Sequence, residues 1–97
     1  MEVDVVHSLQ IRDKDKEAIL KFIETLKAKF ADDLLSIMIY GSAVKDNYFP
    51  GSSDINLMVV FHEFYTEHLK IISPIVKAYR SRDRISTLVL GINEILE

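Results

Sequence analysis

Two short apolar runs separated by a polar loop constrain the fold of this chain most. They cover Leu34 to Tyr40 and Ile55 to Phe61. Apolar, β-rich runs of this length suit buried strands better than helices. The segment between them includes Asp46 to Ser53, which collects Asp, Asn, Pro, Gly and Ser, the composition of a turn-rich surface loop. The sequence therefore predicts two strands with a surface loop between them.

Helical periodicity flanks the two runs. From Asp13 to Phe30 the apolar residues recur at helical spacing, with lysines and glutamates on the opposite side, which predicts an amphipathic helix. A second helix is expected over about Tyr65 to Tyr79. Because Pro74 lies inside it and Ser73 is a suitable helix cap, the pattern favours a kink or two short helices.

The remaining segments complete the expected fold. Ile85 to Leu90 is a third strand candidate, and Val3 to Val6 is a candidate short strand at the N-terminus. Asn93 to Glu97 has the pattern of a capped helix beginning, with Asn93 as the cap. The order of elements predicts a two-layer α/β (α+β) domain, in which helices pack on one face of a small mixed β-sheet.

Composition limits the classes of protein. The chain has 97 residues, of which 48% are apolar, so we expect a single domain over residues 1–97. Its abrupt end suggests either a minimal domain or the N-terminal part of a longer protein. A formal charge of −3 argues against nucleic-acid binding by bulk electrostatics and leaves a small charged ligand open. The chain has no cysteine, and no apolar run approaches the roughly 18 residues of a membrane span, so we expect a cytoplasmic protein.

One stretch carries candidate chemistry. After the first predicted strand, Gly41 and Ser42 offer free backbone N–H groups and a hydroxyl with no Cβ at the glycine, which suits a phosphate cradle. On the next strand, Asp54 and Asn56 are two residues apart and so project from the same face. An oxygen pair beside a phosphate loop is a sensible platform for magnesium. Lys45, just past the turn, could reach a triphosphate oxygen.

At these residues the chain resembles the DNA polymerase beta-like nucleotidyltransferases, and in size and element order their minimal, antitoxin-type branch. The resemblance covers about Leu34 to Leu90. It is carried by Gly41-Ser42, a short spacer, and Ser52-Ser53-Asp54-Ile55-Asn56 followed by apolar residues. It implies a two-layer nucleotidyltransferase fold. It also implies transfer of a nucleoside monophosphate from a nucleoside triphosphate, ATP being the first choice, to a hydroxyl, with release of pyrophosphate.

The resemblance also implies roles for individual residues. Gly41, Ser42 and Ser53 would hold the triphosphate, and Asp54 would be the catalytic metal ligand. In the family, three carboxylates hold two magnesium ions. Here Asn56 occupies the second acidic position, and an amide oxygen brings no negative charge to a metal ion. Activity weakened by Asn56 is therefore expected.

The third carboxylate of the family pattern is absent from its strand. The segment Arg84 to Leu90 contains no Asp or Glu, although Asp83 precedes it and Glu94 follows it. This leaves an alternative to an enzyme: a catalytically degenerate nucleotide-binding or antitoxin module that pairs with a HEPN-type protein, the partner that the resemblance implies. A homo-oligomer also remains open, and nucleic acid is expected only as an acceptor.

Other polar and aromatic residues have simpler interpretations. His62 and His68 lack metal-pair spacing, so we expect structural or surface roles for them. A short basic cluster around Tyr79 could meet phosphate or RNA, but a solvated helix end is favoured; it comprises Lys77, Arg80, Arg82 and Arg84. A further group is expected in the core or on a partner face: Phe61, Phe64, Tyr65, Ile71, Ile72 and Val76.

Overall fold

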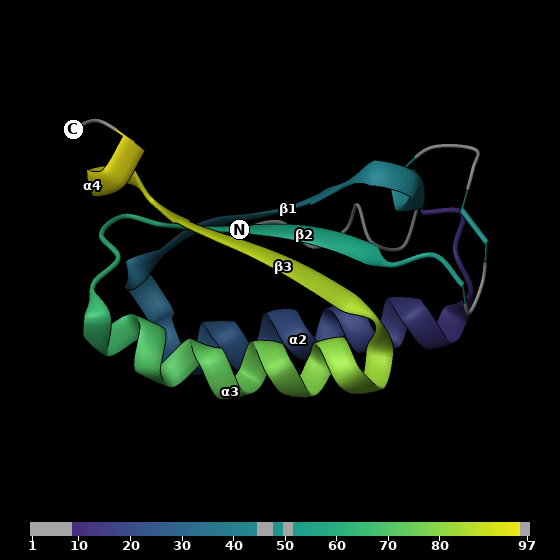
Figure 1. The fold of residues 1–97 in the computed structure, drawn as a ribbon, viewed down its shortest axis with the longest axis horizontal. Helices are drawn as coiled ribbons and strands as arrows, with labels where there is room; N and C mark the ends of the chain where they lie inside the picture. The colour runs from purple at the N-terminus through teal and green to yellow at the C-terminus, as the bar shows by residue number, and fades with distance from the viewer. Residues whose placement is uncertain (1–8, 45–47, 50–51, 96–97) are drawn as a thin grey trace.

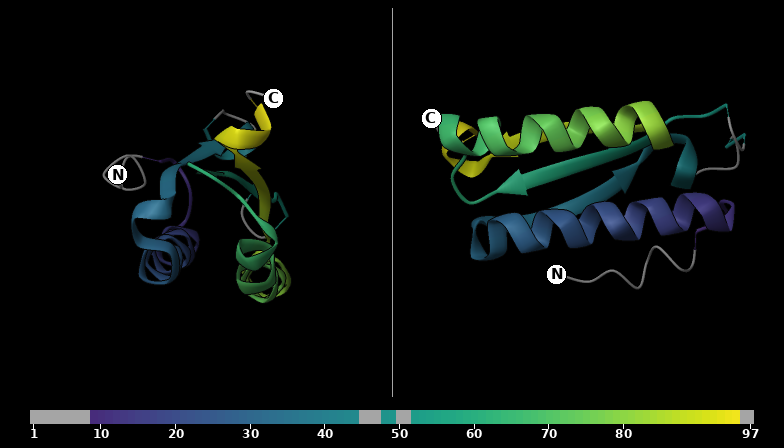
Figure 2. Two further views of the ribbon diagram at one scale, coloured as in Figure 1. Left: turned by 90° about the vertical axis from the view of Figure 1, so that its left-hand side faces the viewer. Right: turned by 90° about the horizontal axis from the view of Figure 1, so that it is seen from below.

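The chain folds into a small sheet with both long helices on one of its faces (Figures 1 and 2). The computed structural model describes residues 9–44, 48–49 and 52–95. The candidate strand at Val3 to Val6 lies outside the described residues. Within them, the two-layer architecture predicted from the sequence is confirmed.

The sheet has three strands, β1 (Leu34–Tyr40), β2 (Ile55–Phe61) and β3 (Ile85–Gly91). Their order is β1-β2-β3; β1 and β2 are antiparallel, and β2 and β3 are parallel, so the sheet is mixed as predicted. The parallel pair needs a long crossover, which the helix between β2 and β3 supplies. All three strands lie where the apolar runs predict them.

Helix α2 (Asp13–Phe30) supplies the largest share of the core. Its apolar stripe is buried against the sheet, as its spacing predicts. Phe30 meets Phe61 of β2 edge to face, with ring centroids 4.9 Å apart, and Phe22 meets Tyr79 of the second long helix at 5.0 Å. Such aromatic pairs add about 0.5–1.5 kcal/mol beyond the area that they bury. A short 3-10 turn, η1 (Ala31–Asp33), joins α2 to β1.

Helix α3 (Thr66–Asp83) corrects one sequence prediction. It is a single helix that continues through Pro74. Of the two alternatives expected from the sequence, two short helices with Ser73 as a cap are therefore wrong, and a kink at Pro74 stays a prediction. The proline is exposed, and the helix is held to the core on both sides of it, by Ile72 before and by Val76 and Tyr79 after. Tertiary packing therefore outweighs the local cost of proline in a helix.

A histidine takes part in the cap at the start of α3. His68 Nδ1 accepts a hydrogen bond from the Tyr65 N–H at 3.0 Å, and its Nε2 lies 3.2 Å from Asp33 Oδ2. Its ring also stacks on Phe64. The structural role expected for His68 is confirmed, and His62 lies at the exposed surface. The residues expected in the core or on a partner face divide between the two places. Phe61 and Ile72 are buried, whereas Tyr65 and Ile71 are exposed.

The end of the chain differs from its prediction. Helix α4 (Ile92–Ile95) begins one residue before Asn93, so Asn93 is not its cap. The Asn93 Oδ1 instead accepts a hydrogen bond from the Phe64 N–H at 3.0 Å. A Cβ at Gly91 would lie 2.7 Å from the Phe64 Cβ, so only glycine allows this close approach.

Alternation along the strands separates the two faces of the sheet. Ile55, Leu57 and Val59 of β2 are buried under the helices. On the opposite face, Met38 and Leu88 remain 47% and 44% exposed. The candidate functional residues Asp54 and Asn56 belong to this open face by the same alternation. Among the described helices, none has the length and apolar character needed to cross a membrane.

Candidate functional site

The turn after β1 brings the backbone against the predicted metal ligand. Gly41 opens the 3-10 turn η2 (Gly41–Val44) with φ +82°, a conformation that glycine adopts without strain. A Cβ on Gly41 would lie 2.6 Å from the Asn56 Nδ2. The turn and Asn56 are therefore in close contact. The side chain of Ser42 and the whole of Lys45 lie outside the described residues, and their predicted roles stay predictions.

Strand register brings a third residue beside this contact. Asn56 is paired with Tyr40 across β1 and with Ser86 across β3. Because paired residues in neighbouring strands point to the same face, Ser86 lies beside Asn56 on the open face. Asp54 precedes β2 just as Arg84 precedes β3, and the Ile55 N–H donates to the Arg84 carbonyl at 2.9 Å.

The loop before Asp54 is anchored to helix α2. The Tyr48 hydroxyl donates a hydrogen bond to the buried carboxylate of Asp15, which also accepts from Arg12 Nε at 2.8 Å. Burial and the bond to Asp15 raise the pKa of Tyr48 to about 12. The hydrogen bond to Asp15 also raises the pKa of Arg12. These contacts connect the loop to the first turn of α2.

Ser53 already has one role inside the loop. Its Oγ accepts a hydrogen bond from the Phe49 N–H at 2.9 Å, and its own N–H donates to the Phe49 carbonyl at 2.9 Å. The hydroxyl hydrogen of Ser53 is a separate donor, because a serine can accept and donate at once. Its contact with a nucleotide stays a prediction.

Arginine, rather than carboxylate, stands beside Asp54. Arg84 Nη2 lies 3.4 Å from Asp54 Oδ1 and donates a hydrogen bond to the Ser52 carbonyl. Arg80 Nη1, from the last turn of α3, donates to Ser86 Oγ at 3.3 Å. A pocket of about 160 Å³ lies here, lined by Asp54, Arg80, Ser81, Arg84 and Ser86.

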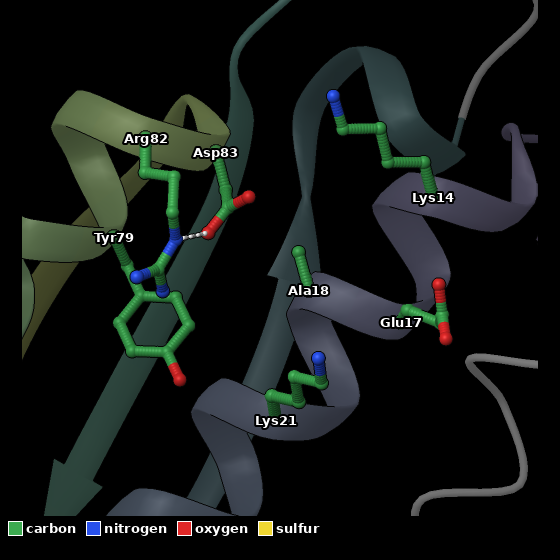
Figure 3. Close-up of a pocket in the computed structure, with 7 residues that line it drawn as sticks. All are labelled: Lys14, Glu17, Ala18, Lys21, Tyr79, Arg82 and Asp83. Atoms are coloured by element: carbon green, nitrogen blue, oxygen red, sulfur yellow. Dashed lines mark hydrogen bonds and ion pairs between the residues drawn. The ribbon is translucent and has the colours of Figure 1, made fainter.

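The rest of the basic cluster faces elsewhere. Arg82 lies over the Tyr79 ring, 4.7 Å from its centroid, and donates to Asp83 Oδ2 at 2.9 Å, which raises the pKa of Arg82 (Figure 3). Both residues line a larger hollow of about 550 Å³ between α2 and α3. Its charged rim includes Lys14 from α2. Asp83 is thus engaged in this hollow, between the helices, and is not among the residues lining the pocket beside Asp54.

The chemical character of the donor atoms decides how many metal ions the site suits. Asp54, Asn56 and Ser86 offer one carboxylate, one amide and one hydroxyl. Magnesium takes few protein ligands and completes its shell with water and phosphate oxygens, so this set fits one ion carried by a triphosphate. It does not fit two ions, which need bridging carboxylates to offset their repulsion. Within the described residues, no three His, Cys, Asp or Glu side chains group as a metal site.

The sequence did not indicate Ser86, and it favoured the simpler interpretation of Arg80 and Arg84. The place of Ser86 beside Asn56 depends on the register of β3 against β2, and a strand's sequence does not fix its partner residues. Arg80 and Arg84 belong to the basic cluster for which a solvated helix end was favoured over contact with phosphate. One signal was present in the sequence: Arg84 and Ser86 repeat the two-residue spacing of Asp54 and Asn56.

Comparison with known proteins identifies the family. A family model described as a nucleotidyltransferase domain matches residues 19–94, which is most of the chain and includes every element from α2 to β3 in whole or in part. No curated protein and no solved structure matches the chain. The small mixed sheet with two helices on one face is consistent with a nucleotidyltransferase fold. The chain belongs to the nucleotidyltransferase domain family.

Proposed function

We propose that the protein binds a nucleoside triphosphate with one Mg²⁺ and transfers its nucleoside monophosphate to a hydroxyl, with release of pyrophosphate. The observation that carries this proposal is the contact between the Gly41 turn and Asn56, next to Asp54. Glycine at this position lets Asn56 lie directly against the turn. Free backbone N–H groups in such a turn suit phosphate oxygens, and the side-chain oxygens of Asp54 and Asn56 suit the cation that accompanies them. ATP is the first nucleotide to test.

Each residue contributes a separate part of the proposed reaction. The backbone of Gly41 and the side chains of Ser42, Ser53 and Lys45 would bind the triphosphate. Asp54 and Asn56 would orient the nucleotide through its cation, which neutralises phosphate charge when bound. The acceptor hydroxyl would enter from the open face of the sheet, where Met38 and Leu88 are exposed.

Calorimetry with ATP and Mg²⁺ tests the binding step. Wild type should bind, and Asp54→Ala should bind at least about tenfold more weakly, because a charged ligand to the cation is lost. Asp32→Ala removes an exposed carboxylate on the η1 turn and is the matched control. Equal binding by wild type and Asp54→Ala, or by neither, would contradict the proposal.

A second candidate function is a catalytically degenerate module that binds nucleotide and pairs with a HEPN-type protein. It is favoured by the single carboxylate at the site and by the exposed apolar side chains of Met38, Tyr40 and Leu88. A transfer assay with labelled ATP separates the two candidates, because only the enzyme incorporates label. The pairing is tested by size-exclusion chromatography with a HEPN-type protein, where Met38→Glu should weaken the complex.

A further inference from the structure

We infer that the pocket between the end of α3 and the start of β3 is a phosphate-binding site in which Arg80 and Arg84 supply the positive charge. The pocket measures about 160 Å³. Sites for whole small molecules usually enclose about 300–1,000 Å³, so this one has room for a single charged group of a larger ligand. Two guanidinium groups face one carboxylate there, and this balance favours an anion.

The arginines retain donors for such a group. Through its Nη2, Arg84 donates a hydrogen bond to the Ser52 carbonyl and forms an ion pair with Asp54. Arg80 donates to Ser86 through its Nη1. A guanidinium carries five N–H donors in a planar fork that matches the oxygens of a phosphate. The Arg84–Asp54 separation of 3.4 Å exceeds the about 2.7–2.9 Å of a charge-assisted hydrogen bond. A phosphate oxygen at the shorter distance would interact with Arg84 more strongly than Asp54 does in this structure.

The backbone of Arg84 supports a role for its side chain. Arg84 ends α3 in the left-handed region, at φ 58° and ψ 30°, where glycine is the common residue. This conformation costs a residue with a Cβ about 1 kcal/mol or more. An arginine held there, with its side chain at the predicted site, is consistent with binding rather than with helix termination alone.

The sheet order places the pocket relative to the Gly41 turn and so bears on which molecule supplies the phosphate. Because the order is β1-β2-β3, Gly41 and the arginines lie on opposite sides of Asn56. If the proposed function holds, the group in the pocket belongs either to the nucleotide or to the acceptor hydroxyl's own molecule. Both sources present the same chemistry, a phosphate oxygen cluster.

Inorganic phosphate is the probe for the pocket. Amide NMR spectra are recorded during a phosphate titration in EDTA, against sodium chloride of equal ionic strength. We expect shifts centred on Arg84 and Ser86, and an apparent Kd at least about tenfold higher in Arg84→Gln and Arg80→Gln. Arg82→Gln is the matched control, because it removes the same charge from a residue turned toward Tyr79 and Asp83. It should leave the Kd unchanged.

A carboxylate variant separates this pocket from binding through a metal ion. In EDTA, Asp54→Asn should bind phosphate at least as tightly as wild type, because it removes the negative charge nearest Arg84. A site that depended on a cation at Asp54 would bind no phosphate in EDTA, in wild type or in the variant. Shifts centred elsewhere, or wild-type affinity in both Arg80→Gln and Arg84→Gln with native spectra, would overturn the inference.

Saturation with a non-hydrolysable ATP analogue and Mg²⁺ assigns the source. Loss of inorganic phosphate binding indicates that the nucleotide's own phosphates fill the pocket, and retained binding indicates the acceptor; both support a phosphate site. Failure of the analogue to bind contradicts the proposed function alone, because the EDTA titration decides the pocket without a nucleotide.

Discussion

Arg84 combines a backbone conformation suited to glycine with a side chain that lies beside Asp54. Its φ of 58° brings the Cβ close to the following carbonyl oxygen, whereas its guanidinium reaches both Ser52 and Asp54. Stability and binding therefore make opposite demands on this residue. A glycine would relieve the backbone but would remove the charge from the pocket.

This conflict predicts the order of two variants. Arg84→Gly should be more stable than Arg84→Ala by about 1 kcal/mol, because both remove the side chain and only glycine is unstrained in the left-handed region. Urea denaturation measures the difference as a change in midpoint at constant slope.

The neighbouring helical arginine supplies the control. Arg82 lies inside α3, where glycine is less favourable than alanine by about 1 kcal/mol. Arg82→Gly should therefore be less stable than Arg82→Ala. The same sign at both positions would mean that the backbone of Arg84 is not strained.

At the scale of elements, the sequence predicted best where hydrophobic periodicity and burial agree. The helix Asp13–Phe30 and the strands Leu34–Tyr40 and Ile55–Phe61 lie where their patterns place them. The second helix was misjudged because local proline chemistry was weighed without the packing on both sides of Pro74. The place of Ser86 beside Asn56 was missed because strand register is a tertiary property.

The correction at α3 predicts the effect of removing its proline. Pro74→Ala should stabilise the protein by about 1–2 kcal/mol, because the new N–H completes the helix ladder and only part of the gain is offset by a more flexible unfolded chain. Thermal unfolding measures the gain. Ser73→Ala is the companion variant: it should cost less than the about 1 kcal/mol lost with a true N-cap. A loss of stability in Pro74→Ala would contradict this account of the helix.

The anchor between the loop and α2 predicts a pH dependence. The pKa of Tyr48 rises from its ordinary 10 to about 12 in the folded protein, so the folded state holds this proton more tightly than the unfolded state. The resulting stability is fully present below pH 10 and is lost as the pH rises toward 12. At neutral pH, Tyr48→Phe should lower the free energy of unfolding by about 1 kcal/mol, because the bond to Asp15 is lost.

Lysines titrate in the same pH range as Tyr48. Because wild type and Tyr48→Phe contain the same lysines, the difference in stability between them reports the contribution of Tyr48 alone. The difference in the free energy of unfolding between wild type and Tyr48→Phe, measured by urea denaturation, should be smaller at pH 11.5 than at pH 9. These two values lie on either side of about 10, the ordinary pKa of tyrosine. A constant difference would mean that the Tyr48–Asp15 bond does not couple the loop to α2.

At the scale of the whole molecule, charge is distributed unevenly. The chain carries a net charge of −3, yet the pocket beside Asp54 is lined by two arginines and one carboxylate. Asn56 and Ser86, the strand residues nearest this pocket, carry no charge. Without nucleotide, this site therefore has one carboxylate with which to attract Mg²⁺, and we expect the stability of the protein to be nearly independent of this ion.

Restoring one charge should change this behaviour. Asn56→Asp places a second carboxylate on the face that carries Asp54, which should raise the affinity for Mg²⁺ by about tenfold or more. Since an ion that binds only the folded state stabilises it, about 1 kcal/mol of binding should raise the Tm by about 4–8 °C in a domain of this size. The exposed Thr66→Glu adds the same charge at the start of α3, at the opposite end of the sheet from the site (Figure 1), and should show no such rise. If Mg²⁺ raises the Tm of wild type and Asn56→Asp equally, then the missing charge at residue 56 does not limit metal binding, and Arg84 beside Asp54 becomes the next candidate barrier.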